Sequence, residues 1–144
     1  MTRNDRFWIY TSTLLAGGSG LIYFWMRYLL TPVDEFAIIN HPLQPQVQHL
    51  HVLTAPLLLF ALGLIWKTHI RKNRRSPGKP RKKSGATLYY SVVPMVASGY
   101  AIQVSASEQL RNVAAWIHSA TSLLFVAVFC WHAYRGYRSR NREK

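Results

Sequence analysis

The sequence predicts an all-α integral membrane protein, a single four-helix bundle formed by residues 1–144. Hydrophobic residues make up 49% of the chain, and the charged residues, 16% of it, are confined to a few blocks. Long uncharged runs lie between these blocks, a pattern that neither a small soluble domain nor a disordered chain shows. A helix needs about 20 mostly apolar residues to cross roughly 30 Å of hydrocarbon. Four runs meet this requirement, namely residues 7–30, 47–66, 86–104 and 113–134.

The first run is expected to be a retained membrane helix and not a signal peptide. It is longer than the apolar region of a signal peptide, polar residues interrupt it, and no small-residue cleavage site follows a short apolar stretch. The single cysteine, Cys130, lies inside the fourth run. An internal disulfide and a cysteine-based zinc cluster are therefore excluded.

The distribution of positive charge predicts the orientation of the spans. Of the 18 Lys and Arg residues, 16 lie before the first run, in the basic loop 67–85 or in the basic tail 135–144. The positive-inside rule places both termini and this loop in the cytoplasm, an N-in, C-in topology. Contact with the anionic headgroups of the lipid bilayer accounts for these charges. Nucleic-acid binding is not expected, because the basic loop has no interleaved aromatic residues and the chain has no soluble recognition module.

Ionisable residues inside membrane spans are costly and indicate function, so the six histidines are the main functional candidates. His118 and His132 are 14 residues apart in the fourth run, which on an α-helix puts them on one face, separated by about 21 Å. His51 and His69 are 18 residues apart, five whole turns, which predicts a shared face and a separation of about 27 Å. His49 points about 160° away from His51. The shared face with His69 favours His51 over His49 as a ligand.

The second and fourth runs are parallel, because alternate spans cross the membrane in the same direction. His51 is then expected to meet His118 near the outside, and His69 to meet His132 near the cytoplasm. The two axial separations differ by about 6 Å, a mismatch that falls chiefly on His69 and that helix tilt can absorb. Two separated histidine pairs suit bis-histidine haems better than zinc, which takes three or four clustered ligands. The alternative is that the histidines only form hydrogen bonds between helices.

Two segments carry a resemblance to a known family. They are HLHVLTAPLLL at residues 49–59 and WIHS at residues 116–119, with 14 residues from His118 to His132. Over roughly the last two-thirds of the chain, they resemble the four-helix di-haem b-type cytochromes, the membrane subunits of hydrogenases, formate dehydrogenases and thiosulfate-reductase-like complexes. The resemblance implies haem b, a bacterial inner membrane, and electron transfer between a periplasmic cytochrome c or iron-sulfur protein and quinone or another partner. Because the first run has no histidine, both partner ligands come from the second.

Haem propionates are anionic and need cations at the ends of their cavity. On the outer side only Arg27 and Arg111 remain, so Arg111 is the preferred propionate partner and Arg27 the second choice, with snorkelling to lipid headgroups as the alternative. The small residues 16–20 and the pair Ser98-Gly99 allow either a neighbouring helix or a flat macrocycle to approach the backbone.

The expected function is an electron-transfer subunit associated with other membrane subunits, not a self-contained enzyme, since almost no mass lies outside the spans. Asp34, Glu35 and Glu108 are the candidate docking residues for the periplasmic partner. The alternative is a cofactor-free anchor or assembly subunit. A proton or metal-ion transporter is disfavoured, because the four runs contain no Asp or Glu and show no inverted repeat.

Overall fold

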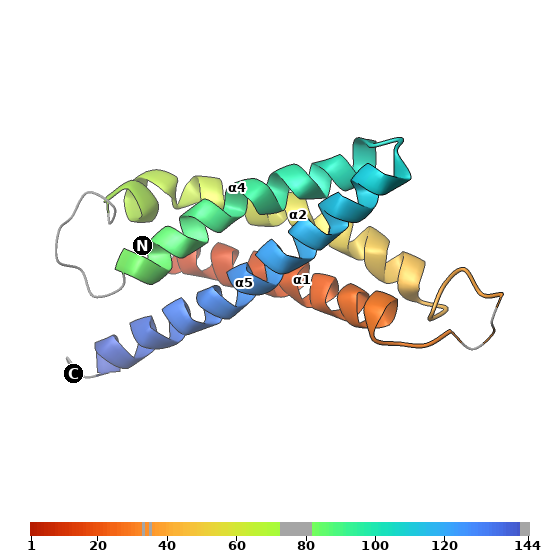
Figure 1. Ribbon diagram of the computed structural model, residues 1–144. Coiled ribbons are helices and arrows are strands. Elements are labelled where there is room, and N and C mark those ends of the chain that lie inside the picture. Colours follow the sequence, from red (N-terminus) through yellow and green to blue (C-terminus); the bar gives the residue numbers. More distant parts are fainter. Residues whose placement is uncertain (33, 35, 73–81, 142–144) are drawn as a thin grey trace. The chain divides into compact units, whose positions relative to one another are not determined.

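Figure 1 shows the computed structural model of the chain, which describes residues 1–32, 34, 36–72 and 82–141. Over these residues the protein is all-helical and has no β-strand. Its elements are α1 (Arg3–Tyr28), α2 (Gln44–Leu64), the π-helix η1 (Trp66–Arg71), α4 (Lys82–Val104) and α5 (Glu108–Asn141). The predicted all-α class is confirmed.

The helices form two hairpins, each of which is a compact unit. Residues Met1–His69 make the first unit, where α1 packs on α2, and residues Ile70–Lys144 make the second, where α4 packs on α5. The two helices of each hairpin run antiparallel (Figure 1). In both units the histidines of interest lie on the second helix or just beyond it.

The helices extend beyond the apolar runs that predicted them, chiefly at their basic ends. The tail predicted at 135–144 is helical up to Asn141, and the loop predicted at 67–85 is helical up to Lys72 and again from Lys82. Hydropathy marks only the apolar part of a helix, and Lys and Arg are good helix formers. Residues 73–81 and 142–144 of the predicted loop and tail lie outside the described residues.

The helix that carries His51 does not continue regularly to His69. The α-helix ends at Leu64, and Trp66–Arg71 forms the π-helix η1, in which hydrogen bonds run from residue i to i+5. The predicted step of 100° per residue between His51 and His69 is therefore wrong. A π-helix also advances less along its axis per residue than an α-helix does, so the predicted separation of about 27 Å is too long.

A capping box starts α1. The Thr2 hydroxyl accepts the backbone N–H of Asp5 at 3.0 Å, and the Thr2 backbone N–H donates to the Asp5 carboxylate at 2.8 Å. These bonds satisfy donors that the first turn of a helix leaves unpaired. At the other end, the Asn40 side-chain amide donates to the carbonyls of Arg27 and Leu30, at 2.9 and 3.0 Å. This residue therefore fixes the start of α2 against the end of α1.

The buried face of α1 is made of small and hydroxylated residues, while its exposed face is apolar. Ser12, Thr13, Ala16 and Ser19 are buried, whereas Leu14 is 74% exposed. Small residues let two helix backbones approach closely, as helices do in membranes. The exposed apolar side chains continue on the other helices, for example at Leu53, Val93, Trp116 and Trp131.

Two helices are long and apolar enough to cross a membrane, judged by length and composition. They are Gln44–Leu64 and the Glu108–Ser139 part of α5. Both were predicted as spans. The other two predicted spans, in α1 and α4, do not pass the same test, because the serine, threonine and glycine residues in these helices lower their mean hydropathy.

Replacing Leu53 by arginine tests whether α2 crosses a bilayer. Leu53 lies near the middle of α2 and is 73% exposed. If lipid surrounds it, arginine near the bilayer centre costs about 2.5–3.5 kcal/mol of insertion free energy, and the inserted fraction should fall. A glycosylation-based insertion assay measures this fraction, with Leu53→Ile as the control. Equal insertion of the two variants would show that this face of α2 does not contact lipid.

Candidate functional site

Three histidine rings lie against the three Ser-Gly pairs of the chain. The pairs are Ser19-Gly20 on α1, and Ser84-Gly85 and Ser98-Gly99 on α4. Each pair lies on the first helix of a hairpin, and each histidine that contacts it comes from the second helix. The rings are those of His51, His132 and His118, in the same order, and all three are half-buried.

The His51 ring packs directly on the backbone of α1. Its Nδ1 lies 2.9 Å from the Ala16 carbonyl oxygen. A Cβ atom at Gly20 would come within 2.8 Å of the ring carbon Cε1, a distance that real Cβ atoms essentially never show. The Ser19 hydroxyl donates to the same Ala16 carbonyl at 3.2 Å. Glycine at position 20 therefore makes the contact between ring and backbone possible.

The second hairpin repeats this arrangement at His118. The Nδ1 atom lies 2.8 Å from the Met95 carbonyl oxygen, and a Cβ at Gly99 would come within 3.1 Å of Cε1. The Ser98 hydroxyl donates to the Met95 carbonyl at 3.1 Å. In both hairpins the carbonyl, the serine and the glycine stand at positions i, i+3 and i+4 of the first helix.

These contacts determine which ring nitrogen of His51 and His118 carries the hydrogen. A carbonyl oxygen only accepts hydrogen bonds, so Nδ1 must be the donor in both rings. In a neutral imidazole the lone pair is then on Nε2. Histidines that bind metals have this arrangement, with one nitrogen as the ligand and the other N–H bonded to a carbonyl or carboxylate. Both rings are thus in the tautomer that ligates through Nε2.

His132 contacts a serine hydroxyl where the other two rings contact a carbonyl. Its Nδ1 lies 2.9 Å from the Ser84 hydroxyl oxygen. A Cβ at Gly85 would be 3.6 Å from Cε1, an ordinary van der Waals distance. Ser84 is the third residue of α4, so no full helical turn precedes it to supply a carbonyl at position i.

The register of the second hairpin brings both of its histidines to Ser-Gly pairs. His118 and His132 are 14 residues apart, as are Gly99 and Gly85 on the antiparallel helix. The two contacts are consequently about 21 Å apart along the hairpin. In the first hairpin, the residues 14 positions before Ser19 and Gly20 are Asp5 and Arg6, so a second Ser-Gly pair is missing.

His69, the fourth predicted ligand, lies in η1 and acts electrostatically on Asp5. The backbone N–H of Thr2 is the main cause that holds the pKa of the Asp5 carboxyl below its usual value, and the positive charge of His69 lowers it further. Asp5 stands where Ser84 stands in the second hairpin. The polar group near the fourth histidine is therefore a carboxylate.

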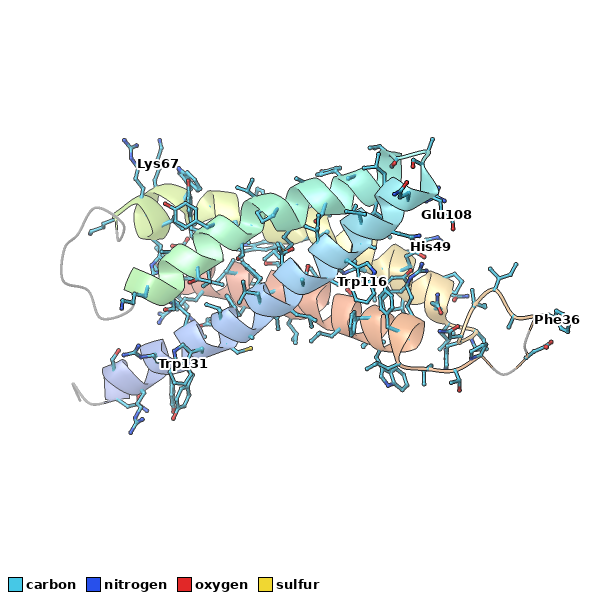
Figure 2. The ribbon with its side chains drawn as sticks, viewed as in Figure 1. Phe36, His49, Lys67, Glu108, Trp116 and Trp131 are labelled. Atoms are coloured by element: carbon cyan, nitrogen blue, oxygen red, sulfur yellow. The ribbon has the colours of Figure 1, made fainter. Side chains whose placement is uncertain are left out.

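The remaining sequence candidates lie at the periphery of the hairpins. His49 is exposed on α2 (Figure 2), and Nδ1 of His41 accepts the Leu43 backbone N–H at 3.1 Å. Arg111 is exposed in the first turn of α5. The Arg27 guanidinium stands 5.7 Å from the centre of the Tyr28 ring.

The candidate docking residues are spread over the two hairpins. Asp34 uses its carboxylate to accept the Phe36 backbone N–H at 3.1 Å, and Glu108 is exposed where α5 begins (Figure 2). Glu35 lies outside the described residues. Each predicted histidine pair, His51 with His118 and His69 with His132, takes one residue from each hairpin.

Sequence reasoning missed Ser84-Gly85 as a site element. The 14-residue repeat of Ser-Gly within α4 matches the 14-residue spacing of His118 and His132, and this match is the signal that would have found it. It also assigned the small residues 16–20 to helix or macrocycle contact, whereas Gly20 accommodates an imidazole ring.

Among the described residues, no group of three or more His, Cys, Asp or Glu side chains could hold a metal ion. Comparison with protein-family models, with curated proteins and with solved structures finds no match.

Gly20→Ala and Gly18→Ala form a matched test of the ring contact. A Cβ at Gly18 meets nothing within 4 Å, so this change should stabilise α1 by about 0.5–1 kcal/mol. At Gly20 the new methyl must displace the His51 ring and break its bond to Ala16, which should cost about 1–3 kcal/mol. Thermal unfolding followed by circular dichroism measures both, and equal midpoints for the two variants would contradict the contact.

Proposed function

We propose that this chain is the four-helix membrane subunit of an electron-transfer complex and that it carries electrons through haem b held by its histidines. The repeated contact at His51 and His118 carries this proposal. In each hairpin an imidazole N–H donates to a backbone carbonyl of the opposing helix, at 2.9 and 2.8 Å. A histidine that only bonds two helices can use either ring nitrogen, but here both leave Nε2 as the lone-pair nitrogen.

The donor set suits iron in a haem. Neutral imidazole is a common axial ligand, and a bis-histidine haem needs only two such groups. Gly20 and Gly99 let each ring approach the helix backbone, which fixes the orientation of the ring. When bound, haem supplies one-electron redox chemistry, and the chain supplies ligands, orientation and a surrounding that excludes water.

In the proposed arrangement, each haem takes one ligand from each hairpin. His51 and His118 hold the outer haem, and His69 and His132 hold the inner one, near the basic cytoplasmic ends of the helices. The π-helix at Trp66–Arg71 supports the inner pair, because it reduces the depth mismatch that a regular α-helix would leave. Arg111 is proposed to pair with a propionate of the outer haem, since it is exposed on the outer half of α5.

All four helices are proposed to cross a bacterial inner membrane with both termini in the cytoplasm. The apolar outer face of α1 supports a span there, although its mean hydropathy is lowered by buried serine and threonine. The cluster of Lys and Arg residues at one end of the chain's helices supports the orientation.

The proposed partners are other membrane subunits, a periplasmic cytochrome c or iron-sulfur protein, and quinone. A chain with so little mass outside its helices passes electrons between partners and needs them for any substrate chemistry. The competing function is a cofactor-free anchor, in which the same histidines only hold the hairpins together.

Haem content per chain is the decisive measurement. Protein supplied with haem during expression should give the reduced-minus-oxidised spectrum of a b-type cytochrome and two haems per chain by the pyridine-haemochrome method. His51→Ala and His118→Ala should each remove one haem. His49→Ala, on the same helix as His51 but exposed, is the matched control and should keep both.

The possible results separate the competing functions. One haem per chain, lost in His51→Ala and His118→Ala, would keep the outer pair and remove His69 and His132 as ligands. Folded protein without any haem would reject the cytochrome proposal and favour the anchor.

A further inference from the structure

We propose that Ser84 is a positioning residue that holds His132 in its ligating tautomer and tunes the inner haem independently of the outer one. This inference rests on the proposed function. It starts from the one difference among the three Ser-Gly contacts. His51 and His118 donate to backbone carbonyls, whereas Nδ1 of His132 faces the Ser84 hydroxyl at 2.9 Å.

The Ser84 hydroxyl can accept from His132 or donate to it, and only one of these directions permits ligation. If the hydroxyl donated to Nδ1, the ring hydrogen would be on Nε2 and that nitrogen could not bind iron. For His132 to be a ligand, Nδ1–H must donate and the Ser84 oxygen must accept. The serine therefore selects the tautomer, a role that the fixed carbonyls of Ala16 and Met95 play for the other two rings.

The local fold explains why a side chain has this role at His132. At Gly20 and Gly99 the carbonyl four residues earlier belongs to the same helix and points along its axis toward the ring. Ser84 and Gly85 are the third and fourth residues of α4, so the helix begins too late to offer a carbonyl of its own at that position. The hydroxyl takes the place of the missing backbone acceptor.

The chemical nature of the acceptor affects the iron through the imidazole. An alcohol oxygen is a weaker hydrogen-bond acceptor than an amide carbonyl, so it polarises the Nδ1–H bond less and leaves the imidazole a poorer electron donor. Hydrogen bonds of this kind are one of the means by which proteins set haem potentials. The change concerns one-electron reduction of the ligated iron, and the Nδ1 proton stays on His132 throughout.

Gly85 supports the assignment to His132 in particular. A Cβ there would meet Cε1 at 3.6 Å, so the ring lies in ordinary contact with the helix and its Nδ1 edge faces Ser84. The second buried serine between the two contacts of α4, Ser91, donates instead to the Leu88 carbonyl at 3.0 Å. Ser91 thus offers a control on the same helix.

The test is a spectroelectrochemical titration of the haem-loaded full chain carrying Ser84→Ala, Ser84→Thr or Ser91→Ala. Ser84→Ala removes the acceptor, so the midpoint potential of one haem should rise, or that haem should be lost, while the other haem keeps its potential. Ser84→Thr retains the hydroxyl and should restore the wild-type behaviour. Ser91→Ala should leave both potentials unchanged.

Three results would overturn the inference. They are unchanged potentials in Ser84→Ala, equal shifts of both haems, and a shift that Ser84→Thr does not reverse. A wild-type chain with a single haem that survives His132→Ala would overturn it as well.

A second measurement does not depend on haem. The nitrogen chemical shifts of the His132 ring in haem-free protein report its tautomer. We expect the Nδ1–H tautomer in the wild type and a shift toward Nε2–H in Ser84→Ala, and the Nε2–H tautomer in the wild type would contradict the role of Ser84. Failure to bind haem with the expected tautomer rejects the proposed function alone, which keeps the two failures distinguishable.

Discussion

The contact between an imidazole ring and the backbone of the opposing helix is the constraint on which both hairpins depend. It requires a residue without Cβ, because a methyl at position 20 would stand 2.8 Å from the His51 ring and one at position 99 would stand 3.1 Å from the His118 ring. It also requires a carbonyl acceptor one turn earlier, which Ala16 and Met95 provide. Since the same bond fixes the tautomer of each ring, the packing of the hairpin and the proposed ligand chemistry have one physical origin.

The two faces of α1 show how a helix can enter a membrane without high mean hydropathy. Its serine and threonine residues face inward, where Ser19 donates to backbone carbonyls within the helix, and its large apolar residues such as Leu14 face outward. A hydroxyl that bonds its own backbone costs little in an apolar surrounding. Helices with this distribution are underrated by averages over all their residues, which explains why α2 and α5 pass a hydropathy test that α1 does not.

The hairpins are alike at their outer ends and different at their basic ends. His51 and His118 have the same set of contacts, whereas His132 faces Ser84 and His69 lies in a π-helix near Asp5. If two haems are present, their ligands therefore differ in the polar group behind each imidazole: two carbonyls in one case, a hydroxyl and a carboxylate in the other. Such differences give two haems of one type distinct potentials, as transfer of electrons from one to the other requires.

The sequence by itself determined the all-α class, the approximate positions of the helices and the 14-residue spacing of His118 and His132, because these depend on composition and on the regular geometry of a single helix. The tertiary structure decided the helix ends, the π-helix that breaks the predicted register of His69, and the Ser-Gly pairs that contact the histidines. Hydropathy reports which solvent a residue prefers, but hydrogen-bond partners such as Ala16 and His51 are 35 residues apart and meet only when two helices pack. The single serine that takes the place of a carbonyl at His132 follows from where α4 begins, a boundary that apolar periodicity does not mark.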